Sequence, residues 1–113
     1  MKRNFALITA GLLLSVSAAS AQVELSKYAD ANGYILVKKL TCGQLANTYQ
    51  EDADFLGVWY SGWYNGLAQK SALNVPRVKE QIHNVIVYCK ANPDKLIIQA
   101  IDVMAKREQG TKQ

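Results

Sequence analysis

The chain has 113 residues, of which 50% are hydrophobic and 19% are charged, and its formal net charge is +4 at pH 7. This length suits one small domain and leaves no room for two. The basic residues are scattered along the chain, so the weak positive charge does not indicate a nucleic-acid-binding protein.

A secretory signal peptide is predicted at the N-terminus. Lys2 and Arg3 precede an apolar run over residues 5–18, and Ala19-Ser20-Ala21 has the small-x-small pattern of a cleavage site. Cleavage after Ala21 leaves 92 residues with a side-chain charge of +2, exported to the periplasm or beyond. No later segment holds about 18 consecutive apolar residues, so we expect no stable membrane anchor.

Export changes how the two cysteines are interpreted. An even number of thiols in a small exported domain is typical of a disulfide, so we expect Cys42 and Cys89 to pair. Loop-closure entropy then contributes about 4 kcal/mol of stability. The alternative, in which Cys42 is a nucleophile and His83 its base, requires a reduced thiol outside the cytosol. We therefore favour the structural disulfide.

Two helices are predicted first after residue 40. Thr41 as N-cap and Gln44 as its capping-box partner predict a short helix that begins at Cys42 and ends near Tyr49. A second, longer helix is predicted over roughly residues 54–70.

Two further helices follow. Asn74 and Pro76 predict the start of the third. Its apolar stripe consists of Val78, Ile82, Val85, Ile86 and Cys89. The fourth is predicted to begin with Asn92 as N-cap, Pro93 at the first helical position and Asp94 in the first turn. Its expected buried face consists of Ile97, Ala100, Ile101 and Met104.

The predicted fold is therefore all-α, a small single-domain bundle of about four short helices stapled by one disulfide, after a cleaved signal peptide. We expect a signal peptide at residues 1–21, a loose N-terminal arm at 22–39, the helical domain at 40–105, and a flexible basic tail at 106–113.

The second helix is unusually aromatic. Its large side chains cover about half of the helix circumference, which is more than a core-facing stripe needs. Surplus aromatic surface is typical of interfaces and binding faces, although burial of all of it in the core is the alternative. Gly57, Gly62 and Gly66 interrupt this helix and each weaken it by roughly 1 kcal/mol relative to alanine, unless they permit close packing. The aromatic members of this predicted surface are Phe55, Trp59, Tyr60, Trp63 and Tyr64.

Residues suited to catalysis are almost absent from the sequence. The single histidine, His83, lies off the apolar stripe of its helix and cannot form a metal site alone. Helix capping explains Asp52 and Asp54 better than general acid–base chemistry does. No phosphate-binding loop or nucleophile elbow occurs. We expect no enzymatic activity, no metal and no cofactor.

Three segments together resemble a known family. They are Leu40-Thr41-Cys42-Gly43-Gln44, Gly57-Val58-Trp59-Tyr60-Ser61-Gly62-Trp63 and Tyr88-Cys89-Lys90-Ala91-Asn92-Pro93. Over roughly residues 40–104, the chain resembles the HdeA/HdeB family of periplasmic acid-stress chaperones. The resemblance implies a helical homodimer with one disulfide near neutral pH. In acid it implies dissociation, partial unfolding and nucleotide-independent holding of denaturing periplasmic proteins. It also implies that the second helix, with Phe55, Val58, Trp59 and Trp63, dimerises and binds clients.

The charge balance agrees with an acid response. Protonation of nine carboxylates takes the mature side-chain charge from +2 to +11, or to +12 with His83 charged, and self-repulsion then opposes compactness. The candidate pH-sensing residues lie at predicted helix starts, where carboxylates are stabilised in their charged form. They are Glu51, Asp52, Asp54 and Asp94.

A small exported protein that binds one specific partner is the alternative from another class. It would be of the immunity or inhibitor type. Disulfide-bonded helical immunity proteins of type VI secretion systems have a similar glycine-aromatic helix and an asparagine-proline-acidic helix start. They more often carry further cysteines, whereas this chain has two. We therefore favour the chaperone.

Overall fold

The computed structural model describes residues 21–111, which form four α-helices and a short 3₁₀ helix and contain no β-strand. The elements are η1 (Leu25–Tyr28), α1 (Cys42–Asn47), α2 (Gln50–Leu67), α3 (Val75–Ala91) and α4 (Ile97–Thr111). The predicted all-α fold is confirmed. The predicted signal peptide lies outside the described residues except for Ala21, and within residues 21–111 no helix is both long and apolar enough to cross a membrane.

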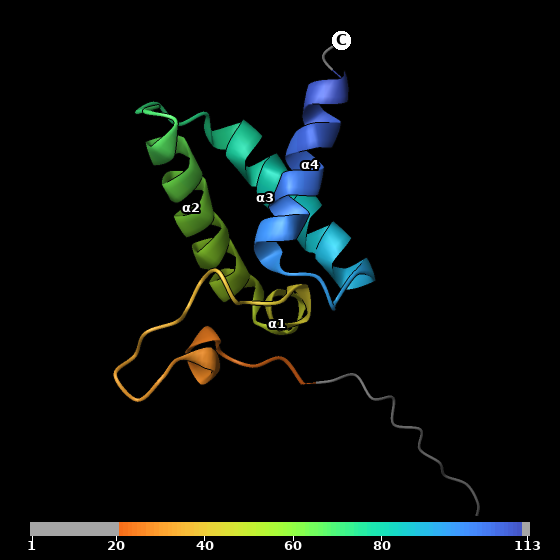
Figure 1. Ribbon diagram of the computed structural model, residues 1–113. Coiled ribbons are helices and arrows are strands. Elements are labelled where there is room, and N and C mark those ends of the chain that lie inside the picture. Colours follow the sequence, from red (N-terminus) through yellow and green to blue (C-terminus); the bar gives the residue numbers. More distant parts are fainter. Residues whose placement is uncertain (1–20, 112–113) are drawn as a thin grey trace, which may run out of the picture.

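The central helix is α3, which packs against α1, α2 and α4. Figure 1 shows α2 and α4 on either side of it, with α1 across their lower ends and the N-terminal segment below α1. The disulfide joins the start of α1 to the last turn of α3 through Cys42 and Cys89, which are both fully buried. The predicted pairing of the two cysteines is confirmed.

The core gathers around this disulfide. The apolar stripe predicted for α3 faces inward, with Val78, Ile86 and Cys89 buried and Ile82 and Val85 half-buried. The inner face predicted for α4 does the same. The buried core consists of Leu25, Leu40, Cys42, Leu45, Ala53, Leu56, Tyr60, Ile86, Cys89, Ile97 and Ala100.

Side-chain caps start two of the helices where predicted. The Thr41 hydroxyl accepts from the Gln44 backbone N at 3.1 Å, and the Gln44 side chain accepts from the Thr41 N at 2.9 Å, which completes the capping box of α1. The Asn74 side chain accepts from the Arg77 N at the start of α3. The α2 helix begins at Gln50, several residues earlier than predicted, with Tyr49 at the N-cap and no side-chain cap.

The predicted start of α4 at Asn92-Pro93-Asp94 is wrong. Asn92 closes α3 instead, because its side chain donates to the Tyr88 carbonyl. The carbonyls of Pro93 and Lys95 then accept from the N–H groups of Gly43 and Cys42, and the Ile97 N donates to the Leu40 carbonyl. Since these bonds tie residues 93–96 to the start of α1, α4 begins only at Ile97.

The N-terminal segment predicted as a loose arm is anchored. The Val23 N donates to the Asn47 carbonyl at 2.9 Å, and the Val23 carbonyl accepts from the Thr48 hydroxyl at 2.8 Å. Leu25 is buried against the core. A single buried leucine in a polar stretch gives no helical or strand period, so the burial of Leu25 left no pattern in the sequence.

The C-terminal segment also differs from its prediction. Residues 106–111, expected to belong to a flexible tail, continue α4 as helix. An ion pair between Lys106 and Asp102 at 3.1 Å supports this part of the helix, and Glu108 reaches across to α3. The end of the helix was predicted from the spacing of apolar residues. Residues 106–111 are held by polar contacts, so that spacing did not reveal them as helical.

Candidate functional site

The outward side of α2 carries an exposed apolar surface, called here the outer patch and made of Phe55, Val58 and Trp59. Their exposed fractions are 68%, 56% and 44%. The spacing of three and one residues places them on one side of the helix. Solvent therefore contacts neighbouring aromatic and aliphatic side chains on this side of α2 in the folded protein. Grouped apolar side chains of this kind are typical of interaction sites.

Tyr60 is not part of this surface, which corrects its predicted place in it. Only 3% of the residue is exposed, and its hydroxyl donates to the Val37 carbonyl. Tyr60 follows the buried Leu56 by four residues, about one helical turn, so both side chains lie on the inward face of α2. Burial, and to a lesser degree Tyr64, raises the pKa of Tyr60 above its ordinary range.

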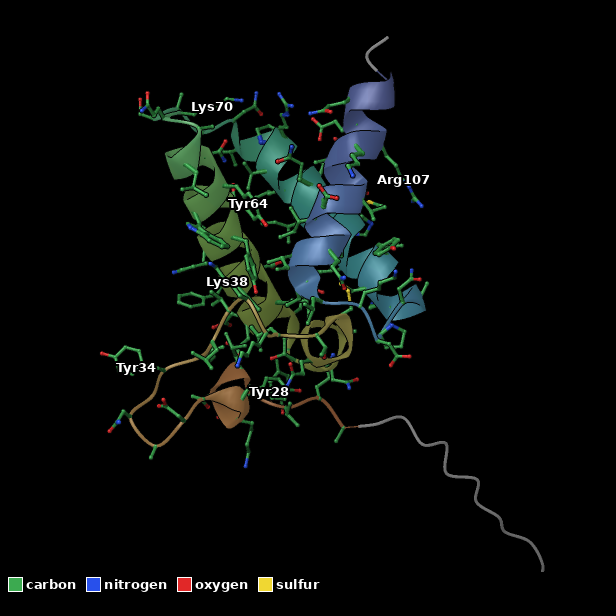
Figure 2. The ribbon with its side chains drawn as sticks, viewed as in Figure 1. Tyr28, Tyr34, Lys38, Tyr64, Lys70 and Arg107 are labelled. Carbon is green, nitrogen blue, oxygen red and sulfur yellow. A yellow bond between two sulfur atoms is a disulfide. The ribbon has the colours of Figure 1, made fainter. Side chains whose placement is uncertain are left out.

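Trp63 extends the outer patch but is half covered. Its ring lies 5.6 Å from the ring of Trp59, and the Lys38 ammonium lies 5.6 Å from its centroid. Such a cation over a ring is weakly attractive. Figure 2 shows Lys38 near the base of α2, on the segment that leads into α1. The N-terminal segment therefore shields part of the aromatic surface.

Tyr64 belongs to a different region, a groove between α2 and α4. Figure 2 shows its side chain on the side of α2 that faces the other helices. Burial and the nearby carboxylate of Asp102 raise the pKa of Tyr64. The groove has a volume of about 730 Å³. Its floor is apolar and includes Val78, Ile82 and Ile101. The predicted set thus divides among outer patch, core and groove.

The four predicted pH-sensing carboxylates lie in different surroundings. Asp52 is half-buried, and its Oδ2 accepts from the Leu25 N at 2.9 Å, which ties η1 to α2. Asp54 accepts from the neighbouring Gln50 side chain, and Glu51 is exposed in the first turn. Asp94 lies in the turn before α4 rather than in the first turn of a helix.

A further carboxylate with tertiary contacts was not predicted. Glu108 pairs with Arg77 at 2.5 Å and accepts from the Gln81 side chain at 3.0 Å. Both partners lie on α3. Neither is near Glu108 in sequence, and their contact with it depends on how α3 and α4 cross. No sequence pattern therefore predicted this contact.

No metal-binding site is found in the part of the chain that the structure describes. No group of three or more His, Cys, Asp and Glu side chains there is placed to hold a metal ion. His83 is exposed on α3, as predicted.

Comparison with known proteins gives the family. Residues 4–99 match the family model described as the HdeA/HdeB family. The chain belongs to the HdeA/HdeB family. A search of curated proteins and a search of solved structures give no match.

The HdeA/HdeB match covers more of the chain than the resemblance noted in the sequence. It includes the anchored N-terminal segment, the disulfide and all of α2, so the outer patch and Asp52 lie inside it. It ends at residue 99, and most of α4, with Glu108, lies beyond it. Membership of this chaperone family agrees with a surface suited to contacts with other proteins.

Proposed function

We propose that this protein is an ATP-independent holdase chaperone of the periplasm that acid activates and that prevents aggregation of acid-denatured proteins. The observation that carries the proposal is the outer patch on α2 in a member of the HdeA/HdeB family. A holdase needs accessible apolar surface and no nucleotide site. The family match favours this function over a specific binder of the immunity or inhibitor type.

The charge balance supplies a reason for activation by acid. Near neutral pH, nine carboxylates almost balance the basic side chains of the mature chain. Acid neutralises the carboxylates, and the remaining positive charges repel one another. Compact packing and subunit association both weaken, so more apolar surface becomes available to unfolding clients. The buried disulfide limits how far the chain opens.

Near neutral pH we propose a homodimer that covers the outer patch. Phe55, Val58 and Trp59 expose an apolar face that a second copy would remove from water. Export by the predicted signal peptide, with cleavage after Ala21, would deliver the chain to the periplasm. That compartment is oxidising, as the disulfide requires.

Light scattering from an acid-labile client tests the proposal. The oxidised protein should suppress aggregation at pH 2 to 4 and should have little effect at pH 7. Full client aggregation at every acidic pH would contradict the chaperone function.

Two valines provide a matched comparison for the outer patch. Val58 on α2 and Val87 on α3 are exposed by 56% and 52%. Val58→Ser should weaken the suppression of aggregation, and Trp59→Ser should weaken it further. Val87→Ser should leave it unchanged. Equal loss in both valine variants would argue against the outer patch as the client surface.

A further inference from the structure

We propose that Glu108 is an acid-sensitive brace that holds the C-terminal end of α4 beside the groove, and that its protonation loosens this end and widens the groove entrance. The inference rests on the proposed function, because it names an element that opens in acid. Glu108 itself lies beyond the family match, whereas its partners Arg77 and Gln81 lie within it.

The two ends of α4 are held differently. At the N-terminal end, Ile97 and Ala100 are fully buried, and the Ile97 N bonds to the Leu40 carbonyl. Beyond Met104 the burial ends: of residues 105–110, all are exposed except Glu108. Apolar packing therefore fixes the first half of α4, whereas the last turns depend on polar contacts.

Glu108 uses both carboxylate oxygens in these contacts. Oε1 accepts from the Arg77 guanidinium and Oε2 from the Gln81 side chain, at 2.5 and 3.0 Å. A carboxylate that accepts from two donors on one helix positions its own helix more firmly than one bond does. Protonation removes the charge attraction to Arg77 and turns one oxygen into a donor that faces donors.

The surroundings strengthen this response. From α3, Arg77 and Glu80 line the same groove; from α2 the titratable group is Tyr64, which faces Asp102. On α4, Asp102 pairs with Lys106. When the carboxylates are protonated, positive charge remains on both α3 and α4 at this entrance, so attraction becomes repulsion.

One contact limits the opening. The Arg107 guanidinium lies 5.5 Å from the centroid of the Tyr88 ring on α3, and acid changes the charge of neither group. Figure 2 shows Arg107 on the side of α4 away from α2. The end of α4 should therefore loosen without detaching, and the apolar floor with Val78 and Ile82 should become more accessible.

Hydrogen–deuterium exchange of the oxidised full chain tests the brace. At pH 7, Glu108→Gln should lower the protection of amides in residues 105–111 about two- to fivefold, the range expected for a partly exposed ion pair. Protection around Cys89 in α3 should stay unchanged. In the wild type, the same local loss should develop as the pH falls through about 5 to 3, after correction for intrinsic exchange rates.

Two further variants separate charge pairing from a general effect of substitution. Glu51→Gln makes the same chemical change at an exposed position of α2 and should leave α4 protected. The charge-swapped pair Arg77→Glu with Glu108→Arg should restore the protection that Glu108→Gln removes.

Wild-type protection of residues 105–111 in Glu108→Gln at pH 7 would overturn the brace. Local loosening in a protein that does not suppress client aggregation would support the brace and contradict the proposed function. The two ideas can therefore fail separately.

Discussion

At the scale of single residues, Asp52 makes one of the contacts that join the N-terminal segment to α2. Its carboxylate accepts from the Leu25 N, and Leu25 is buried next to it. Asp52→Ala leaves that N–H without its charged acceptor, so we expect the free energy of unfolding at pH 7 to fall by about 1 to 2 kcal/mol. Urea unfolding measures this. Asp54→Ala, which removes only an exposed local bond to Gln50, is the control; an equal loss there would contradict the role of Asp52.

The buried phenol of Tyr60 should make the free energy of unfolding depend on pH in the alkaline range. Because burial raises the pKa of Tyr60, its protonated phenol contributes stability that is fully present below the unfolded-state pKa of about 10 and is lost as the pH rises above it. Tyr60→Phe should cost about 1 kcal/mol at pH 7, through loss of the bond to the Val37 carbonyl. Its stability should then fall less than that of the wild type between pH 9 and 11.

Urea unfolding at these pH values checks the prediction for Tyr60. Tyr34→Phe is a suitable control because Tyr34 is largely exposed. A fall of equal size in the wild type and in Tyr60→Phe would contradict a role for the buried phenol.

At the scale of elements, we expect glycine-to-alanine substitutions at two positions of α2 to change the stability of the protein in opposite directions. A Cβ on Gly57 would lie 2.8 Å from the two γ carbons of Ile82, whereas a Cβ on Gly62 would meet nothing within 4 Å. Gly57→Ala should therefore destabilise the protein by about 1 to 3 kcal/mol through overpacking of α2 against α3. Gly62→Ala should stabilise it by up to about 1 kcal/mol through helix propensity.

Thermal unfolding of the two alanine variants decides this prediction. Stabilisation by both would mean that α2 and α3 do not approach closely at Gly57. From the sequence, any of the three glycines of α2 could have permitted close helix packing. In the structure Gly57 does so, whereas Gly62 and Gly66 face open space.

The elements also show what sequence patterns can and cannot predict. The start of α1 was predictable because Thr41 and Gln44 satisfy each other's backbone within one turn. The start of α4 was not, because residues 93–96 bond to α1, more than 45 positions away. Local capping chemistry is visible in a sequence, whereas competition from a distant partner is not.

The candidate site divides along the same line. Helical spacing predicted a broad aromatic surface on α2, and the exposure of Phe55 and Trp59 agrees with it. Val58, which is also exposed, was included through the family resemblance. Spacing did not separate Tyr60 from them, because a wide apolar stripe does not reveal which edge the neighbouring helix covers. Glu108 was missed because its contacts with Arg77 and Gln81 depend on the crossing of two helices.

At the scale of the whole molecule, the disulfide links the start of α1 to the end of α3 and closes a loop across a sequence separation of 47. Replacing both cysteines with alanine should lower the free energy of unfolding by about 4 kcal/mol, a large share of the stability of a domain this small. Suppression of client aggregation should be lost as well, because the acid form would unfold completely. Urea unfolding and light scattering check the two effects, and undiminished suppression would contradict the proposed role of the disulfide.

The central claim is that acid loosens the fold and thereby creates the chaperone. The most direct test follows the near-ultraviolet circular dichroism of the protein and the light scattering of an acid-labile client in the same samples from pH 7 to pH 2. We predict that client protection begins over the same pH interval in which the fixed packing of the tryptophans and tyrosines is lost. Client aggregation that remains complete after this packing is lost would contradict the claim.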